Sequence, residues 1–385
     1  MDVRLIFICR KSEMAHAMTP LSTIPMNDLS RGIERDRVSL TSAALSVFDS
    51  GFVVMGPQHD SFQVALAEYW GVESVVGVAS GTDALELAIR AAMPDGKHTV
   101  LTAANAGGYT SIAARRAGFD VRYADVDSES LCLTSSSMAD ALVDDVGVIV
   151  VTHLYGNVTD IGHLVARAHR AGARVVEDWA QSIGALNPAG TRGITGDIAA
   201  TSFYPTKNLG ALGDGGAVAT NDPDLTKLLV RLRQYGWDSK YHVALSGGIN
   251  SRLDELQAAF LNVRLPLLDL FGTRRRFIVG RYVDAARRGN GAIDVFPANG
   301  RHHVAHLAVA RTNHRNEVRA QLASHGVATD VHYPIPDHQQ PGLKASPVSL
   351  PETERAAKEI FSLPCFPELT DHEIDVVCAA IEGLG

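Results

Sequence analysis

The chain has 385 residues, of which 46% are hydrophobic and 20% are charged, and its formal net charge is −8. This composition is typical of a globular protein, and the length favours one large and one smaller domain over a disordered chain. The negative charge disfavours nucleic acid as the main partner. The one basic block, Arg274-Arg275-Arg276, is typical of a solvated helix face.

The cysteines and histidines predict neither a disulfide framework nor a metal site. No two cysteines form a Cys-x-x-Cys pair, and His302-His303 lacks a metal-ligand spacing. The apolar stretch Leu5-Ile6-Phe7-Ile8 is too short for a signal sequence. No apolar run approaches the roughly 20 residues of a membrane helix. We therefore expect a soluble cytoplasmic protein. The four cysteines are Cys9, Cys132, Cys365 and Cys378.

The chain opens with a weakly patterned segment, residues 1–25, which we expect to be a poorly ordered leader. An amphipathic segment then runs from Asp28 to Phe48. From residue 75, short apolar strands alternate with helices, which predicts a mainly parallel seven-stranded sheet between helices. Ligands of such sheets bind at the carboxyl ends of the strands. The predicted strands are 75–79, 99–102, 120–124, 147–152, 174–178, 199–203 and 216–220, and the predicted helices among them are 84–91, 111–117 and 161–171.

Beyond Arg252 the pattern changes to a long helical stretch, 253–288, with a bend expected at Pro266 or Gly272. The remainder, 294–385, mixes strands and helices on a smaller scale. We therefore divide the chain into a leader (1–25), a large cofactor-binding domain (26–250), and a connecting helix with a small α+β domain (251–385).

An acid and a lysine at two strand ends carry the strongest functional signal. Asp178 closes the predicted strand 174–178, and Lys207 follows the next strand, 29 residues later. Such a pair can hold pyridoxal phosphate: the lysine amine forms a Schiff base with the aldehyde, and the carboxylate keeps the pyridine nitrogen protonated. Taken alone, Asp178 could equally be a helix N-cap and Lys207 a surface lysine.

Other polar residues gather near the same predicted sheet edge. Ser80-Gly81-Thr82 lies between a strand and a helix, where Gly81 lets the backbone approach an anion and Thr82 can cap the helix and bind through its hydroxyl. A plain helix cap explains this triplet equally well. Gln181 can complete a capping box or donate to a ring hydroxyl. Ser202 and Asn250 are further candidates for phosphate contacts, whereas Gly213-Asp-Gly-Gly216 is more typical of a tight turn.

Four stretches of the chain resemble the DegT/DnrJ-type nucleotide-sugar aminotransferases, which are fold-type I pyridoxal phosphate enzymes with an aspartate-aminotransferase-like fold. The resemblance runs from about Met26 to the end of the chain. The stretches are Ser-Phe-Tyr-Pro-Thr-Lys-Asn-Leu-Gly-Ala-Leu-Gly-Asp-Gly-Gly (202–216), Asn-Ser-Arg-Leu-Asp-Glu-Leu-Gln-Ala-Ala (250–259), Glu-Asp-Trp-Ala-Gln-Ser (177–182) and His-Tyr-Pro-Ile-Pro (332–336).

The resemblance implies a role for each candidate. Lys207 would be the Schiff-base lysine and proton shuttle, Asp178 the partner of the pyridine nitrogen, and Gln181 the contact of the ring hydroxyl. The phosphate would be held by Gly81, Thr82 and Ser202, with Asn250 reaching over from the second subunit of a homodimer. His332, Tyr333 and His338 fall where the family lines its sugar pocket.

One position departs from the family pattern. The family usually places an aromatic residue over the cofactor ring in the segment that follows the second strand. This chain reads Ala103-Ala-Asn-Ala-Gly-Gly-Tyr109, which puts Gly107 at that position. We assign the ring contact to Tyr109.

The resemblance implies amine transfer from L-glutamate to a nucleotide-linked keto-deoxyhexose. The segments 332–336 and 235–241 look most like members that act on dTDP-3-keto-6-deoxyhexoses. Alternatives are a 4-keto nucleotide-sugar or cyclitol aminotransferase and a non-catalytic cofactor-binding regulator. The related sugar 3-dehydratases carry histidine where this chain has Lys207. A nicotinamide enzyme would need a Gly-x-Gly-x-x-Gly turn, which Val78-Ala-Ser-Gly-Thr-Asp83 lacks.

Overall fold

The computed structural model describes residues 23–343 and 346–385, and most of the predicted leader lies outside these ranges. The described end of that leader is packed and not loose. Ile24 is 5% exposed and pairs with Val327 of the small domain. The packed chain therefore includes residues that we expected to belong to a poorly ordered leader.

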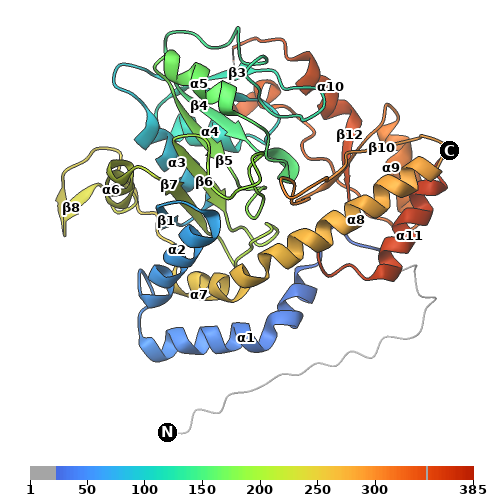
Figure 1. The fold of residues 1–385 in the computed structure, drawn as a ribbon, viewed down its shortest axis with the longest axis horizontal. Helices are drawn as coiled ribbons and strands as arrows, with labels where there is room; N and C mark the ends of the chain where they lie inside the picture. The colour runs from blue at the N-terminus through green and yellow to red at the C-terminus, as the bar shows by residue number, and fades with distance from the viewer. Residues whose placement is uncertain (1–22, 344–345) are drawn as a thin grey trace.

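A seven-stranded sheet forms the centre of the large domain, as predicted (Figure 1). Its strand order is β1-β7-β6-β5-β4-β2-β3. Only β7 runs antiparallel to its neighbours, β1 and β6. Except for the edge strand β3, the strands are nearly continuous runs of buried residues, because helices cover both faces. They are β1 (Ser74–Val78), β2 (Thr99–Ala103), β3 (Asp120–Ala124), β4 (Val146–Thr152), β5 (Arg174–Asp178), β6 (Ile198–Ser202) and β7 (Gly216–Thr220).

Helices pack on the two faces of this sheet through separate apolar cores. One core joins α3, α4 and α6 to one face, and two further clusters cover the other. Beside the sheet, a short hairpin of β8 (Trp237–Ser239) and β9 (His242–Val243) projects from the body (Figure 1). The helices are α1 (Leu29–Ser50), α2 (Pro57–Trp70), α3 (Gly81–Ala92), α4 (Tyr109–Arg116), α5 (Gly162–Arg170) and α6 (Pro223–Leu232).

The expected long helical stretch is two helices, α7 (Glu255–Arg264) and α8 (Leu268–Arg288). A 3₁₀ turn, Leu265–Leu267, separates them, so the bend lies at Pro266. Proline lacks the N–H that a continuing α-helix needs, whereas Gly272 lies inside unbroken helix.

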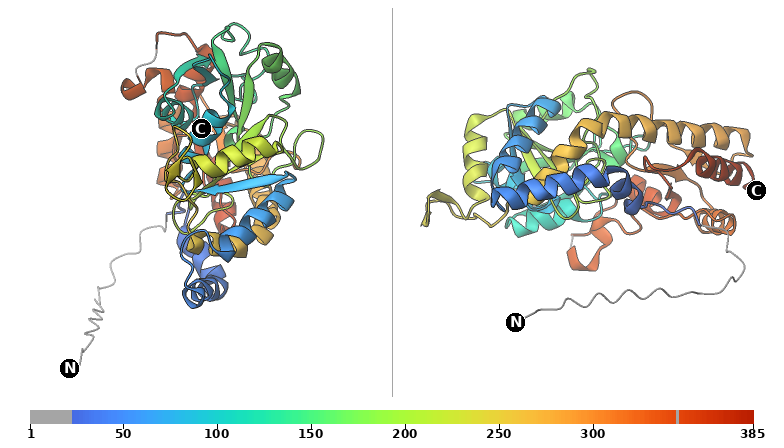
Figure 2. Two further views of the ribbon diagram at one scale, coloured as in Figure 1. Left: turned by 90° about the vertical axis from the view of Figure 1, so that its left-hand side faces the viewer. Right: turned by 90° about the horizontal axis from the view of Figure 1, so that it is seen from below.

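The small domain has a core of its own around α8 and a three-stranded sheet in the order β10-β11-β12. Its last helix, drawn in dark red, lies alongside the orange α8 (Figure 2). A salt bridge from Arg31 of α1 to Glu373, at 2.7 Å, joins its last helix to the start of the large domain. Its elements are β10 (Asp294–Val295), β11 (Ala308–Arg311), α9 (Arg315–Ser324), α10 (Pro351–Glu359), β12 (Ile360–Leu363) and α11 (Asp371–Glu382).

Among the described residues, no helix has both the length and the apolar character that a membrane crossing requires.

Candidate active site

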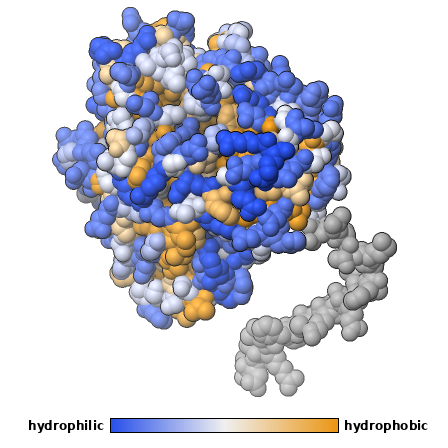
Figure 3. Space-filling model, turned by 45° about the vertical axis from the view of Figure 1, so that its right-hand side comes forward, coloured by the Kyte–Doolittle hydropathy of each residue, from blue (hydrophilic) through white to orange (hydrophobic). Residues whose placement is uncertain are grey.

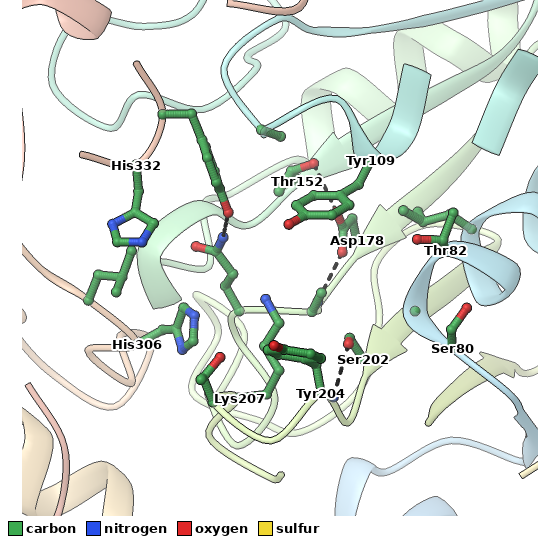
Figure 4. A pocket seen from close by; sticks show the side chains of 18 of the residues that line it. Ser80, Thr82, Tyr109, Thr152, Asp178, Ser202, Tyr204, Lys207, His306 and His332 are labelled. Atoms are coloured by element: carbon green, nitrogen blue, oxygen red, sulfur yellow. Dashed lines mark hydrogen bonds between the residues drawn. The ribbon is translucent and has the colours of Figure 1, made fainter. Parts of the chain in front are cut away.

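A cavity of about 570 Å³ lies at the carboxyl ends of β4, β5 and β6 (Figure 4). The large domain lines it with residues that follow these strands, and the small domain adds residues from three segments far along the chain. Its polar lining residues include Ser80, Thr82, Thr152, Asp178, Gln181, Ser202, Lys207, His306, His332 and Tyr333. The ends of parallel strands therefore meet at this cavity, as expected for the sheet class.

Asp178 is the last residue of β5 and is 5% exposed. The register of β4 and β5 places Thr152 beside it, and the Thr152 hydroxyl donates to Oδ2 at 3.2 Å. The Ala180 N–H donates to Oδ1 at 2.9 Å. Burial raises the pKa of Asp178, although these hydrogen bonds and Lys207 oppose the rise. A cationic group beside this buried carboxylate would stabilise its charge.

Beneath Asp178, a buried network holds the end of β5 in place. Glu177 accepts hydrogen bonds from His153 Nε2 at 2.7 Å, Trp179 Nε1 at 3.0 Å, and the N–H groups of Thr195 and Gly196. Burial raises the pKa of Glu177, but the His153 hydrogen bond and the other donors outweigh it, so the pKa lies below its ordinary value. These hydrogen bonds to Glu177 fix the end of β5, and with it the position of Asp178.

Lys207 lies in the turn after β6, and its amine points into the cavity (Figure 4). Burial lowers the pKa of this lysine, with Asp178 acting in the opposite direction. A lower pKa makes the neutral, nucleophilic amine more available near neutral pH.

The start of α3 lines the same cavity as this pair. Ser80, not Thr82, is the N-cap of α3, and its hydroxyl accepts from the Asp83 N–H at 3.1 Å. The capping role predicted for Thr82 is therefore wrong, and Thr82 lines the cavity instead. A Cβ on Gly81 would lie 2.5 Å from the Cβ of Ser202, so only glycine fits this close approach. The N-terminus of α3 and the hydroxyls of Thr82 and Ser202 suit a phosphate.

Gln181 has a fixed orientation at the opposite end of the cavity. Its Oε1 accepts from the Tyr155 N–H at 2.6 Å, and its Nε2 donates to the Tyr333 hydroxyl at 3.2 Å. Tyr109, the first residue of α4, also lines the cavity and is 48% exposed.

A model of the DegT/DnrJ/EryC1/StrS aminotransferase family matches residues 35–382 of the chain. The chain belongs to this family. A dTDP-3-amino-3,4,6-trideoxy-alpha-D-glucose transaminase of Micromonospora megalomicea subsp. nigra is 37% identical over 362 residues, which cover 91% of this chain and 97% of that protein.

Two solved structures of the family have the same fold. S. venezuelae DesV in complex with a ketimine intermediate matches with a TM-score of 0.88 and 35% identity, over 94% of this chain and 100% of that one. NtdA of Bacillus subtilis with the bound cofactor PMP matches with a TM-score of 0.87 and 28% identity, over 94% and 85% of the two chains. The protein is thus a pyridoxal phosphate-dependent aminotransferase with the expected fold-type I architecture.

The residues around the cavity fit the family cofactor. A buried carboxylate lies at one end, a lysine amine with a lowered pKa lies beside it, and a cradle that only glycine permits lies at the start of α3. These groups suit the ring nitrogen, the aldehyde and the phosphate of pyridoxal phosphate, respectively.

Two of the predicted site residues, His338 and Asn250, do not line this cavity. His338 contacts Glu354 through Nε2 at 3.2 Å and does not line the cavity. Asn250 is exposed and lines a neighbouring pocket with Ser80 and Val54. Within one subunit, the structure therefore does not bring either side chain to Lys207.

Sequence reasoning missed His306, which lines the cavity and shows no local signal. Asn208 donates through Nδ2 to the Val304 carbonyl, so its Oδ1 accepts from His306 Nδ1 at 3.0 Å. Burial lowers the pKa of His306, and Lys207 lowers it further. His306 therefore carries its proton on Nδ1 and presents Nε2 as an acceptor. His306 lies in the loop before β11, and only the fold shows that this loop reaches the cavity.

Proposed function

We propose that the protein transfers an amino group from L-glutamate to the keto carbon of a nucleotide-linked deoxyhexose, in the biosynthesis of an aminosugar. The observation that carries this proposal is the pairing of Asp178 and Lys207 in a buried cavity of a family aminotransferase. The name of the Micromonospora relative supports a dTDP-3-keto-6-deoxyhexose as the acceptor.

In this proposal, Lys207 bears the cofactor and then moves the proton at the reacting carbon of the substrate. Pyridoxal phosphate, when bound, supplies the electron sink for that step. Asp178 stabilises the protonated ring nitrogen, and Thr152 and the Ala180 N–H orient its carboxylate. The lowered pKa of Lys207 suits a group that must both accept and return a proton near neutral pH.

The remaining residues hold the two ends of the ligands. We assign Gly81, Thr82 and Ser202 to the phosphate, because the helix start and the hydroxyls converge there. Gln181 is assigned to the ring hydroxyl, and Tyr109 to the open face of the ring. His332 and Tyr333 line the small-domain side of the cavity, where the sugar would enter.

We further propose that two chains form a homodimer with shared sites. The surface of α1 and the following loop exposes apolar side chains that a monomer would leave in water. Hydrophobic surface is visible at the lower end of the molecule, where α1 lies (Figure 3). Asn250 and Val54 line a pocket that reaches Ser80 from outside the main cavity. The exposed apolar residues are Leu29, Val38, Leu45, Phe48, Phe52, Val53 and Val54.

The direct test is Lys207→Ala in the full-length protein. We expect it to remove the absorbance band of the lysine–cofactor linkage and to lower transamination by at least about a thousandfold, because both the covalent link and the proton shuttle are lost. Lys227→Ala, which changes an exposed lysine on α6, is the matched control. Assays would follow amine transfer from glutamate to a panel of 3-keto and 4-keto nucleotide sugars. Normal turnover by Lys207→Ala would disprove the proposal.

A further inference from the structure

The Tyr333 hydroxyl has an unused proton at the ring end of the cavity. The Tyr155 N–H occupies Gln181 Oε1, so the amide group at Gln181 Nε2 is the donor in the 3.2 Å contact with Tyr333. The Tyr333 oxygen accepts that hydrogen bond. Its own O–H proton is therefore available to a ligand in the cavity.

The Tyr333 ring can occupy its position only because Gly107 has no side chain. A Cβ built on Gly107 would lie 2.9 Å from Tyr333 Cε1 and 3.0 Å from Cδ1 and Cζ, which is closer than real Cβ atoms approach a ring. Gly107 has a φ of 77°, which also favours glycine. The residue that departs from the family pattern is thus the one that admits Tyr333.

The segment that carries Tyr333 is fastened to α4 and to the large domain at several points. Asp337 accepts from the Gly108 N–H at 2.8 Å and from the Ser111 hydroxyl at 2.6 Å, and its own N–H donates to the Ala104 carbonyl. The Tyr155 hydroxyl donates to the His332 carbonyl at 2.5 Å. The position of Tyr333 is therefore set by tertiary contacts on both sides of it.

The surroundings keep the Tyr333 proton in place. Burial raises the pKa of the Tyr333 hydroxyl above its ordinary value, so the group keeps its proton at neutral pH. The two nearby carboxylates, Asp178 and Asp337, already accept hydrogen bonds from their own donors. The titratable groups around the ring are Tyr109, Tyr155, Asp178, His332 and Asp337.

We propose that Tyr333 donates a hydrogen bond to the ring oxygen of pyridoxal phosphate, beside Gln181, and that Gly107 provides the space for it. The inference rests on the proposed placement of the cofactor between Asp178 and Lys207. A donor on the ring oxygen withdraws negative charge from it, so this oxygen holds the proton of the neighbouring lysine–cofactor nitrogen less firmly. Tyr333 therefore lowers the pH at which the linkage loses its proton.

The test is a pH titration of the linkage absorbance in the loaded protein, which needs no turnover. Tyr333→Phe keeps the ring and removes the donor, so the midpoint should rise by about one pH unit, the size of a single hydrogen-bond effect. Tyr69→Phe removes a phenol hydroxyl that bonds Asp269 outside the cavity, and it should leave the midpoint unchanged. A Tyr333→Phe protein that titrates like the wild type would overturn the inference.

A pair of glycine variants tests the seat of the ring independently. Gly107→Ala and Gly108→Ala both place a side chain at a positive φ, of 77° and 82°, and thus introduce the same strain. Only the methyl group at 107 meets Tyr333, since the nearest atoms at 108 are 3.7 Å away. We expect the midpoint of the linkage titration to rise in Gly107→Ala and not in Gly108→Ala. Equal midpoints in the two variants would contradict the role of Gly107 in positioning Tyr333. A linkage band that persists in Lys207→Ala would instead disprove the proposed function.

Discussion

At the residue scale, the same burial acts in opposite directions on the two central groups. It raises the pKa of Asp178 and lowers that of Lys207, so burial disfavours the charged form of both groups. A protonated ring nitrogen beside Asp178 would restore the missing opposite charge. The site is therefore better suited to hold the cofactor than to stand alone.

Asp337 gives the protein a pH-dependent stability. Burial raises its pKa to about 6. An acid whose folded-state pKa is raised stabilises the fold fully below its unfolded pKa of about 4, and this contribution is lost as the pH rises through about 6. We expect the free energy of unfolding to fall by about 2–3 kcal/mol across this window in the wild type.

Asp337→Asn should flatten this dependence, because the amide cannot ionise but can still accept from the Gly108 N–H. Urea denaturation at pH 4.5 and pH 7 measures the difference. Asp49→Asn, which changes an exposed carboxylate on α1, should retain the wild-type dependence. An identical slope in Asp337→Asn and the wild type would show that Asp337 does not cause it.

At the scale of elements, α8 links the domains and contains two glycines with different surroundings. A Cβ on Gly280 would meet no atom within 4 Å, whereas a Cβ on Gly272 would lie 3.3 Å from the Arg276 guanidinium. Glycine in a helix interior costs about 0.5–1 kcal/mol relative to alanine. Gly280→Ala should therefore raise the free energy of unfolding by about that amount.

The measurement is the urea midpoint of Gly280→Ala compared with Gly272→Ala, which has the same propensity gain but a contact to accommodate. We expect the smaller gain at 272. A lower midpoint for Gly280→Ala than for the wild type would mean that α8 does not limit stability in the way its surroundings indicate.

At the scale of the whole molecule, the proposed dimer can be tested by mixing two impaired variants. We expect Asn250→Ala to weaken activity at least tenfold, about the loss of a hydrogen bond to a charged phosphate. If Asn250 serves the partner's site, a mixed dimer of Lys207→Ala and Asn250→Ala contains one intact site. Mixing should therefore raise the activity well above that of either variant alone.

Absence of restoration in a verified mixed dimer would show that Asn250 does not complete the partner's site. Sedimentation at micromolar concentration provides the companion measurement. A single species of 41 kDa, the mass of one chain, would contradict shared sites altogether.

Local patterning was enough to predict the sheet and the strand ends that meet at the candidate site. Asp178 and Ser202 end apolar strands, so the sequence alone predicted that they meet at one sheet edge, and the strand order confirms this. Pro266 marked the helix break because a missing N–H acts locally. The helix cap was assigned to Thr82 because one helix start offers two hydroxyls, and only the backbone geometry selects Ser80 as the cap.

The sequence by itself determined the strands, the lysine and the acid, because each depends on neighbours within a few residues. Tertiary structure alone decided which distant side chains join them. His306 reaches the cavity through small-domain packing more than 95 residues after Lys207 although no local pattern marks it, and His338 turns away to Glu354. For Tyr333, the family resemblance predicted a place near the cavity, but only the fold shows its contacts with Gly107 and Gln181. Gly107 looked like the loss of an aromatic ring in the sequence. In the fold, the space beside Gly107 is filled by the ring of Tyr333 from the small domain. The local sequence cannot predict this contact, because it depends on how distant segments pack together.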